Sequence, residues 1–229
     1  MGWTQDYVAN DTSEPGNLTS VILAVWNSSL YAGYCSRYIA PTDQSFYIIK
    51  KTGSSWTTDL STTTATLNVY PKFIVFKSVL YAFLRPQDSW KNTGSGWTNF
   101  SMGVTGNSIN FALVYNSTLY VVTKVGNNLT VISTTDGTTW TSDTVDSAAS
   151  STNNTLTGIV SFNDKIYVSS GVELSTSKIY VKNGSWSTIH NVVDDWGVVG
   201  MTTYKTKLYI ATRNTDIIDY DGTTWRQSL

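Results

Sequence analysis

One short pattern, an aromatic residue followed five positions later by a tyrosine, occurs five times along the chain. Each copy is an apolar run, a polar turn that begins with Asn or Lys, an aliphatic residue and the tyrosine, as in VWNSSLY and VYNSTLY. Two β-prone segments joined by a short polar turn are typical of a β-hairpin. The copies lie at Trp26–Tyr31, Phe76–Tyr81, Tyr115–Tyr120, Phe162–Tyr167 and Tyr204–Tyr209.

A second pattern, a tight turn that ends in tryptophan, alternates with the hairpins along the whole chain. It reads TGSSW, TGSGW, DGTTW, NGSW and DGTTW, ending at Trp56, Trp97, Trp140, Trp186 and Trp225. Repeats of about 40–50 residues with four strands each are typical of propeller blades. The sequence therefore predicts one all-β domain over residues 1–229, a five-bladed β-propeller of four-stranded antiparallel blades. The predicted blades are residues 4–56, 57–97, 98–140, 141–186 and 187–225.

Each predicted blade begins with the apolar run, continues with the tyrosine strand and a third strand, and ends with a polar strand that starts at the tryptophan. The first two strands are nearly continuous in apolar residues, which predicts that neighbouring blades cover both of their faces. In the second blade the third strand is represented only by QDSWKN, a degenerate copy. The glycine before each tryptophan predicts a turn that needs positive φ. One tryptophan per blade favours a packing role for these residues.

The motif of the fourth strand also occurs at the start of the chain, as Trp3-Thr4-Gln5-Asp6. Propellers commonly close when a terminal strand completes the blade begun at the other terminus. Here residues 1–7 and 225–229 are both candidates for the closing strand, and the sequence does not choose between them.

The repeats resemble those of Kelch-like and Asp-box propellers. The spaced Tyr and Trp of Kelch repeats are present, but only Ala32-Gly33 approaches their double glycine. The segment from Ser133 to Trp140, STTDGTTW, comes near the Asp-box turn but lacks the residue between Asp and Gly. The resemblance implies a fold and no particular activity, because propellers host many unrelated functions.

Composition excludes several classes of protein. The net charge is −1 with scattered basic residues, which argues against nucleic-acid binding. No apolar run reaches the roughly 18 residues of a membrane span, and no signal peptide is expected because the repeat begins at residue 2. Cys35 is the only cysteine and His190 the only histidine, so neither a disulfide nor a metal site is expected.

Charged residues make up 14% of the chain, against about 25% in typical soluble proteins, and Ser and Thr replace them. Asn-X-Ser/Thr sequons occur at Asn10, Asn17, Asn27, Asn99, Asn116, Asn128, Asn153 and Asn183. In so Asn- and Thr-rich a chain many arise by chance. The composition nevertheless suits an extracellular or virion-surface setting, and it resembles that of surface and virion proteins of acidophilic archaea and their viruses.

Catalysis is not expected. Propeller glycosidases need paired carboxyl groups near the central cavity, yet the five predicted first strands contain neither Asp nor Glu. The nearest acid, Asp164, lies in a hairpin turn. A Ser–His–Asp set with Asp194 or Asp195 is formally open, but no serine has a nucleophile-elbow context. His190 is expected to be a solvent-exposed loop residue, and no cofactor is expected.

Residues that depart from the repeat are the candidates for ligand binding. They are Asp194, Asp195 and Trp196, together with His190 in the same segment and Trp90 in the degenerate strand. Aromatic rings beside carboxylates suit sugar recognition, and the alternative for Trp196 is that it plugs the end of the ring. The sequence favours a non-catalytic module that recognises a glycan or glycoprotein receptor. The alternatives are a structural subunit that contacts neighbouring subunits of a virion, filament or surface assembly and, third, a glycosidase.

Overall fold

The computed structural model describes residues 18–37, 44–64, 71–107, 109–147, 155–171, 177–192, 197–212 and 215–227. The chain divides into two compact units, residues 1–101 and residues 102–229. The prediction of one domain with the blade boundaries given above stays a prediction. The predicted site segment Asp194-Asp195-Trp196 lies outside the described residues.

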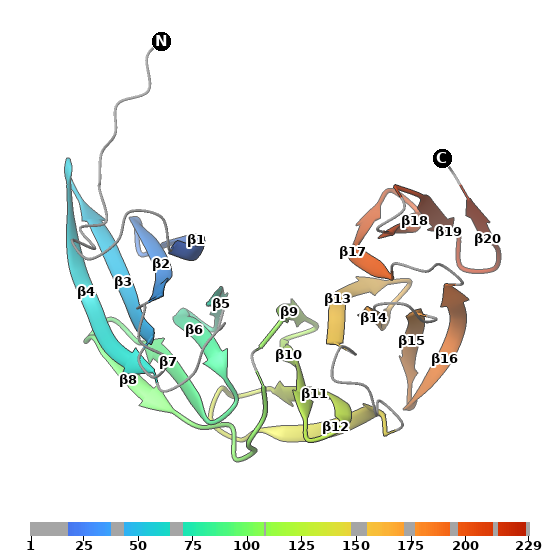
Figure 1. Ribbon diagram of the computed structural model, residues 1–229, viewed down its shortest axis with the longest axis horizontal. Helices are drawn as coiled ribbons and strands as arrows, with labels where there is room; N and C mark the ends of the chain where they lie inside the picture. Colours follow the sequence, from blue (N-terminus) through green and yellow to red (C-terminus); the bar gives the residue numbers. More distant parts are fainter. Residues whose placement is uncertain are drawn as a thin grey trace, which may run out of the picture. The chain divides into compact units, whose positions relative to one another are not determined.

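The first unit contains two four-stranded antiparallel sheets, each with its strands in sequence order (Figure 1). The first sheet consists of β1 (Leu18–Trp26), β2 (Ser29–Arg37), β3 (Gln44–Thr52) and β4 (Ser55–Thr64). The second sheet consists of β5 (Lys72–Phe76), β6 (Val79–Arg85), β7 (Asp88–Asn92) and β8 (Trp97–Phe100).

The second unit contains three further sheets of the same kind (Figure 1). The third sheet is formed by β9 (Phe111–Tyr115), β10 (Thr118–Val125), β11 (Asn128–Thr134) and β12 (Thr141–Asp146). The fourth is formed by β13 (Thr155–Phe162), β14 (Lys165–Gly171), β15 (Ser177–Asn183) and β16 (Ser185–Val192). The fifth is formed by β17 (Val198–Tyr204), β18 (Lys207–Thr212), β19 (Ile217–Tyr220) and β20 (Trp225–Gln227). The prediction of five four-stranded antiparallel sheets is confirmed.

The repeated aromatic-to-tyrosine pattern forms the hairpin between the first and second strands of every sheet. In four of the five hairpins both central turn residues have positive φ, as in Asn27 (46°) and Ser28 (58°). This is the backbone of a type I′ turn, whose twist matches that of the flanking strands. Asn tolerates this conformation better than most residues, which explains its recurrence at the first turn position.

The glycine that precedes each tryptophan also adopts the predicted conformation. Gly137 has a φ of 78° and Gly222 a φ of 102°, and the corresponding glycines of the other sheets are likewise positive. Just before these two glycines, Asp136 and Asp221 each accept hydrogen bonds from the two backbone N–H groups that follow the glycine. These local hydrogen bonds stabilise the turn, which places the tryptophan at the start of the fourth strand.

The segment QDSWKN is not degenerate in structure. Its residues 88–92 form β7, the third strand of the second sheet, and Trp90 pairs with Ala82 of β6 and Asn99 of β8. The short strand lacks the β-branched residues of its counterparts, and pairing on both sides compensates for that weak local preference.

The core lies between neighbouring sheets within each unit. Phe46 and Ile48 pack with Leu80 and Leu84 between the first and second sheets, and similar aliphatic clusters join the third, fourth and fifth sheets. One expectation is wrong: β1 is not covered on both faces, because Leu23 is 60% exposed. Its neighbours along the same face, Val21 and Val25, are exposed as well.

The C-terminal candidate for a closing strand has a defined place. β20 pairs with β19 as the fourth strand of the fifth sheet. The other candidate, residues 1–7, lies outside the described residues, so closure of the ring by a terminal strand stays a prediction.

Candidate functional site

Two neighbouring sheet pairs are joined by the same tryptophan contact. At the third and fourth sheets, Trp186 Nε1 donates to Asp143 Oδ2 at 3.2 Å, and Lys182 Nζ also contacts that oxygen. In the first unit, Trp97 Nε1 donates to Asp59 Oδ2 at 2.6 Å. Both acceptors stand three residues after the tryptophan of the preceding sheet, in the sequence W-T-x-D. The tryptophan of one sheet is thus held by the fourth strand of the sheet before it.

The junction of the fourth and fifth sheets departs from this pattern. The residue three positions after Trp186 is Ile189, so the fourth strand offers Trp225 no carboxylate at that position. Instead Trp225 stacks on His190 of β16, with ring centroids 4.3 Å apart and an interplanar angle of 15°. On its own sheet it stacks on its cross-strand partner Tyr220, again at 4.3 Å. The repeat tryptophan is therefore fixed here by aromatic contacts.

His190 does not lie where the sequence predicted. It belongs to a strand rather than a loop, is half-buried, and packs face to face on an indole. Burial lowers the pKa of its imidazole below the ordinary value, because removing water disfavours the charged form. The ring is neutral at neutral pH.

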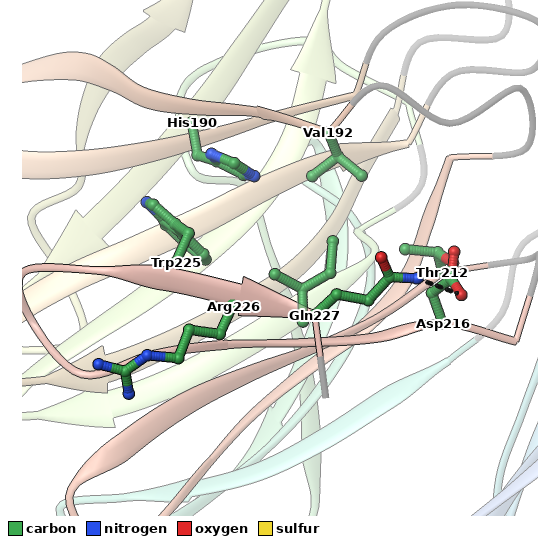
Figure 2. Close-up of a pocket in the computed structure, with 8 residues that line it drawn as sticks. His190, Val192, Thr212, Asp216, Trp225, Arg226 and Gln227 are labelled. Carbon is green, nitrogen blue, oxygen red and sulfur yellow. Dashed lines mark hydrogen bonds between the residues drawn. The ribbon is translucent and has the colours of Figure 1, made fainter. Parts of the chain in front are cut away.

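Beside this stack is a pocket of about 250 Å³ between β16 and the strands of the fifth sheet (Figure 2). Its lining combines aromatic, aliphatic and hydrogen-bonding side chains. The lining residues are His190, Val192, Thr212, Asp216, Ile218, Trp225, Arg226 and Gln227.

The polar groups of the pocket lie at two ends. At one end Gln227 Nε2 donates to Asp216 Oδ1 at 2.9 Å, drawn as a dashed line in Figure 2. At the other end, Arg226 Nη2 is 3.0 Å from Oδ2 of Asp221, a residue that does not line the pocket. The pKa of Asp221 is held well below its usual range by hydrogen bonds from the Thr223 hydroxyl and from the N–H groups of Thr224 and Thr223. Arg226 therefore keeps an ionised partner even in mild acid.

Thr212 adds a polar group with no evident role in the fold. The residue is 5% exposed, and its Oγ1 atom has no hydrogen-bond partner among the residues that the structure describes. Its backbone is satisfied, since Thr212 N donates to Asp216 O. A buried hydroxyl without a partner costs stability. Thr212 is also one of the residues that line the pocket.

The predicted site residues are only partly brought together. His190 lines the pocket, and Val192, another lining residue, directly precedes the segment that contains Asp194, Asp195 and Trp196. Trp90 lies in the first unit, half-buried against the cluster between the first two sheets, so it belongs to a hydrophobic core.

Sequence reasoning missed Trp225, Asp216, Arg226 and Gln227. Trp225 was assigned to packing as a repeat residue, and the other three have no motif of their own. A partial signal was present: the aspartate of W-T-x-D is replaced by Ile189 just before His190, although Phe100 replaces it after Trp97 as well.

A second hollow, of about 460 Å³, lies on the fifth sheet and is mostly apolar, with Tyr204, Tyr209 and Ile217 in its lining. It has few groups that could orient a polar ligand. Within the described ranges no three His, Cys, Asp or Glu residues are grouped as a metal site would require. None of the described segments is a helix long and apolar enough to cross a membrane.

Comparisons with known proteins bear on the fold. No family model matches the chain, and no curated protein sequence is similar to it. Among solved structures, Saccharomyces cerevisiae Sqt1 matches with a TM-score of 0.58 and 10% identity. The match covers 90% of this chain and 58% of Sqt1. A catalytically inactive virginiamycin B lyase from Staphylococcus aureus, solved with quinupristin, matches with a TM-score of 0.58 and 9% identity. This match covers 96% of this chain and 85% of the lyase.

A third match is a mutant of AofleA from Arthrobotrys oligospora, with a TM-score of 0.50 and 14% identity over 90% of this chain and 70% of that one. At such low identity the likeness shows architecture and not activity. The five four-stranded antiparallel sheets and these structural matches together show that the chain has a β-propeller fold.

Proposed function

We propose that the protein is a non-catalytic recognition module that binds a carbohydrate, free or on a glycosylated receptor, in the pocket between the fourth and fifth sheets. The observation that carries the proposal is the composition of this pocket. A carboxylate, an amide and a guanidinium surround partly exposed His190 and Trp225 rings and the aliphatic side chains of Val192 and Ile218. Sugars need this combination, because their hydroxyls require hydrogen-bonding partners while their C–H faces pack on rings.

The size of the pocket agrees with a small ligand. Pockets for drug-sized molecules measure roughly 300–1,000 Å³, and this one is slightly smaller. A terminal sugar of a glycan fits such a space. Trp225 is already stacked on two rings, so the ligand would meet the exposed part of the stack and not a free indole face.

Recognition without catalysis is favoured by the distribution of acids. Glycoside hydrolysis uses two carboxyl groups on opposite sides of the scissile bond. In the described lining of the pocket Asp216 is the one carboxylate. The first strands of all five sheets contain neither Asp nor Glu.

The proposal is tested on a glycan array with the full chain and with a variant in which Asp216 and Gln227 are both replaced by alanine. Loss of binding by about 2 kcal/mol or more would mark the pocket as the binding centre. Asp164→Ala, in a hairpin turn of the fourth sheet, is the matched control and should bind as the wild type does. If the wild type binds no glycan at all, the proposal is wrong.

The predicted loop has a separate test. Replacing Asp195 and Trp196 together by alanine should weaken binding of the same glycan if the segment after Val192 contributes to the site. Unchanged affinity in a folded protein would confine recognition to the pocket. It would also favour the alternative reading of Trp196 as a packing residue.

A role as a structural subunit of a virion, filament or surface assembly is the second candidate. It is favoured by the exposed apolar face of β1, where Val25 is 71% exposed beside Leu23 and Val21. Contiguous exposed apolar side chains commonly mark contact surfaces. Either role suits an extracellular or virion-surface setting, in keeping with the low charge of the chain. Sedimentation analysis separates the candidates, because a subunit of an assembly would self-associate whereas a receptor-binding module need not.

A further inference from the structure

The charges around the pocket bear on which sugars it would select, on the condition that the proposed carbohydrate site is correct. Asp216 accepts one hydrogen bond, from Gln227, and forms no ion pair with any residue that the structure describes. Arg226 is the one cationic side chain in the described lining, and Asp221 already neutralises it. The remaining charge of the lining is therefore negative and sits on Asp216.

The other groups add acceptors rather than cations. The Gln227 amide donates its nitrogen hydrogen to Asp216, and its carbonyl oxygen remains an acceptor. The Thr212 hydroxyl, buried and without a described partner, can donate or accept. Burial lowers the pKa of His190, which favours its uncharged form and so reduces its repulsion of a cation.

We propose that this pocket selects sugars that carry a free, protonated primary amine, with the ammonium group bound by the Asp216 carboxylate and the Gln227 carbonyl oxygen. An ammonium has three donors and no acceptor, which matches a carboxylate beside an amide oxygen. Hydrogen bonds to charged groups are shorter and about twice as strong as neutral ones, so the amine gives selectivity over a neutral sugar. An acidic sugar would meet Asp216 without a free cation to compensate.

Three further charged residues are close in the sequence to residues of the lining. Arg213 follows Thr212, and Asp194 and Asp195 follow Val192 after one residue; all three lie outside the described residues.

The experiment compares three tetrasaccharides by titration calorimetry: β-1,4-linked glucosamine, its fully N-acetylated counterpart, and an oligogalacturonate. At about pH 6 the amine is protonated and carboxylates are ionised. The glucosamine oligomer should bind about tenfold more tightly than the N-acetylated one, as a charged hydrogen bond implies. The oligogalacturonate should bind most weakly.

Asp216→Asn is the decisive variant, because asparagine keeps the shape and can still accept from Gln227 while the charge is lost. It should weaken binding of the glucosamine oligomer about tenfold and weaken binding of the N-acetylated oligomer by a clearly smaller factor. Asp164→Asn removes the same charge elsewhere and should change neither affinity. Raising the salt from about 0.05 to about 0.5 M should weaken only the glucosamine oligomer.

The outcomes separate this inference from the function on which it rests. Equal or tighter binding of the N-acetylated or acidic oligomer would overturn the inference and leave the carbohydrate site in place. An equal loss of all affinities in Asp216→Asn would also overturn it, since the carboxylate would then act through the shape of the pocket. If no oligomer binds and the glycan array is also negative, the proposed function itself fails.

Discussion

The two sheet junctions within the second unit solve the same packing problem with different chemistry. Between the third and fourth sheets, Asp143 accepts hydrogen bonds from Trp186 Nε1 and Lys182 Nζ. Asp146 accepts hydrogen bonds from Lys178 Nζ and the Tyr180 hydroxyl. Between the fourth and fifth sheets, Trp225 meets two aromatic rings and borders a pocket. At the first junction the polar groups bond to one another and stabilise the fold. At the second junction polar groups line a pocket instead.

The difference arises from one position of the repeat. Where the fourth strand carries aspartate three residues after its tryptophan, the next tryptophan has an acceptor for its N–H group. Where Ile189 stands there, no carboxylate is present and His190 supplies a ring instead. Within the second unit, the residue at this position therefore distinguishes the junction that borders the pocket from the junction held by a carboxylate.

Trp225→Ala should have the largest effect, because it removes the ring that both His190 and Tyr220 pack against. We expect a loss of about 3 kcal/mol in the free energy of unfolding, measured by urea denaturation, as for other large-to-small changes at packed aromatic positions. Trp225→Phe should recover part of it by restoring a stack. Trp196→Ala, at a position outside the repeat, is predicted to be nearly neutral. Equal losses from Trp225→Ala and Trp196→Ala would contradict the distinction between repeat and non-repeat tryptophans.

Asp143→Ala should have an intermediate effect. It leaves Trp186 and Lys182 without their acceptor, but both groups are partly exposed and water can replace the carboxylate. A loss of about 1 kcal/mol is expected from chemical denaturation. Asp59→Ala should behave in the same way, because Asp59 occupies the same repeat position for Trp97. If the stability of both variants were unchanged, the repeated spacing W-T-x-D would not stabilise the junction.

The pH dependence contributed by His190 should be the smallest effect. Its pKa is lower in the folded protein than in the unfolded chain, so the unfolded chain binds the proton more readily. Stability is unaffected well above the ordinary pKa of about 6.5 and falls as the pH decreases below it. Wild type should therefore lose stability relative to His190→Gln between about pH 7 and pH 5. If the melting temperatures of the two proteins changed with pH in the same way across this range, the interpretation of His190 as a buried, neutral imidazole would be wrong.

Much of the fold could be predicted because its signals are local. The Asn27-Ser28 turn and its equivalents specify type I′ hairpins, and the glycines before the tryptophans specify positive φ. Both depend on the conformational preferences of two or three adjacent residues. The degenerate strand was misjudged for the opposite reason. Trp90 lies in a segment of weak β-preference, and its strand exists because β6 and β8 pair with it.

The candidate site could not be predicted to the same degree. His190 was singled out from the sequence, but its stacking partner Trp225 is 35 positions away in the chain numbering and resembles every other repeat tryptophan. Asp216 directly precedes β19 and Gln227 ends β20, so the two residues meet only because β19 pairs with β20. No spacing of residues in the sequence predicts this contact between side chains.

The sequence by itself determined the repeat, the number of sheets, their strand order and the conformation of their turns, because these follow from short-range steric preferences and from periodic apolar residues. Only the tertiary structure decided which polar groups satisfy one another across a junction and which remain beside a cavity. That outcome depends on distances between side chains from separate sheets, such as the stack of His190 on Trp225. Local preferences fix the direction of each strand, but packing fixes what its side chains meet.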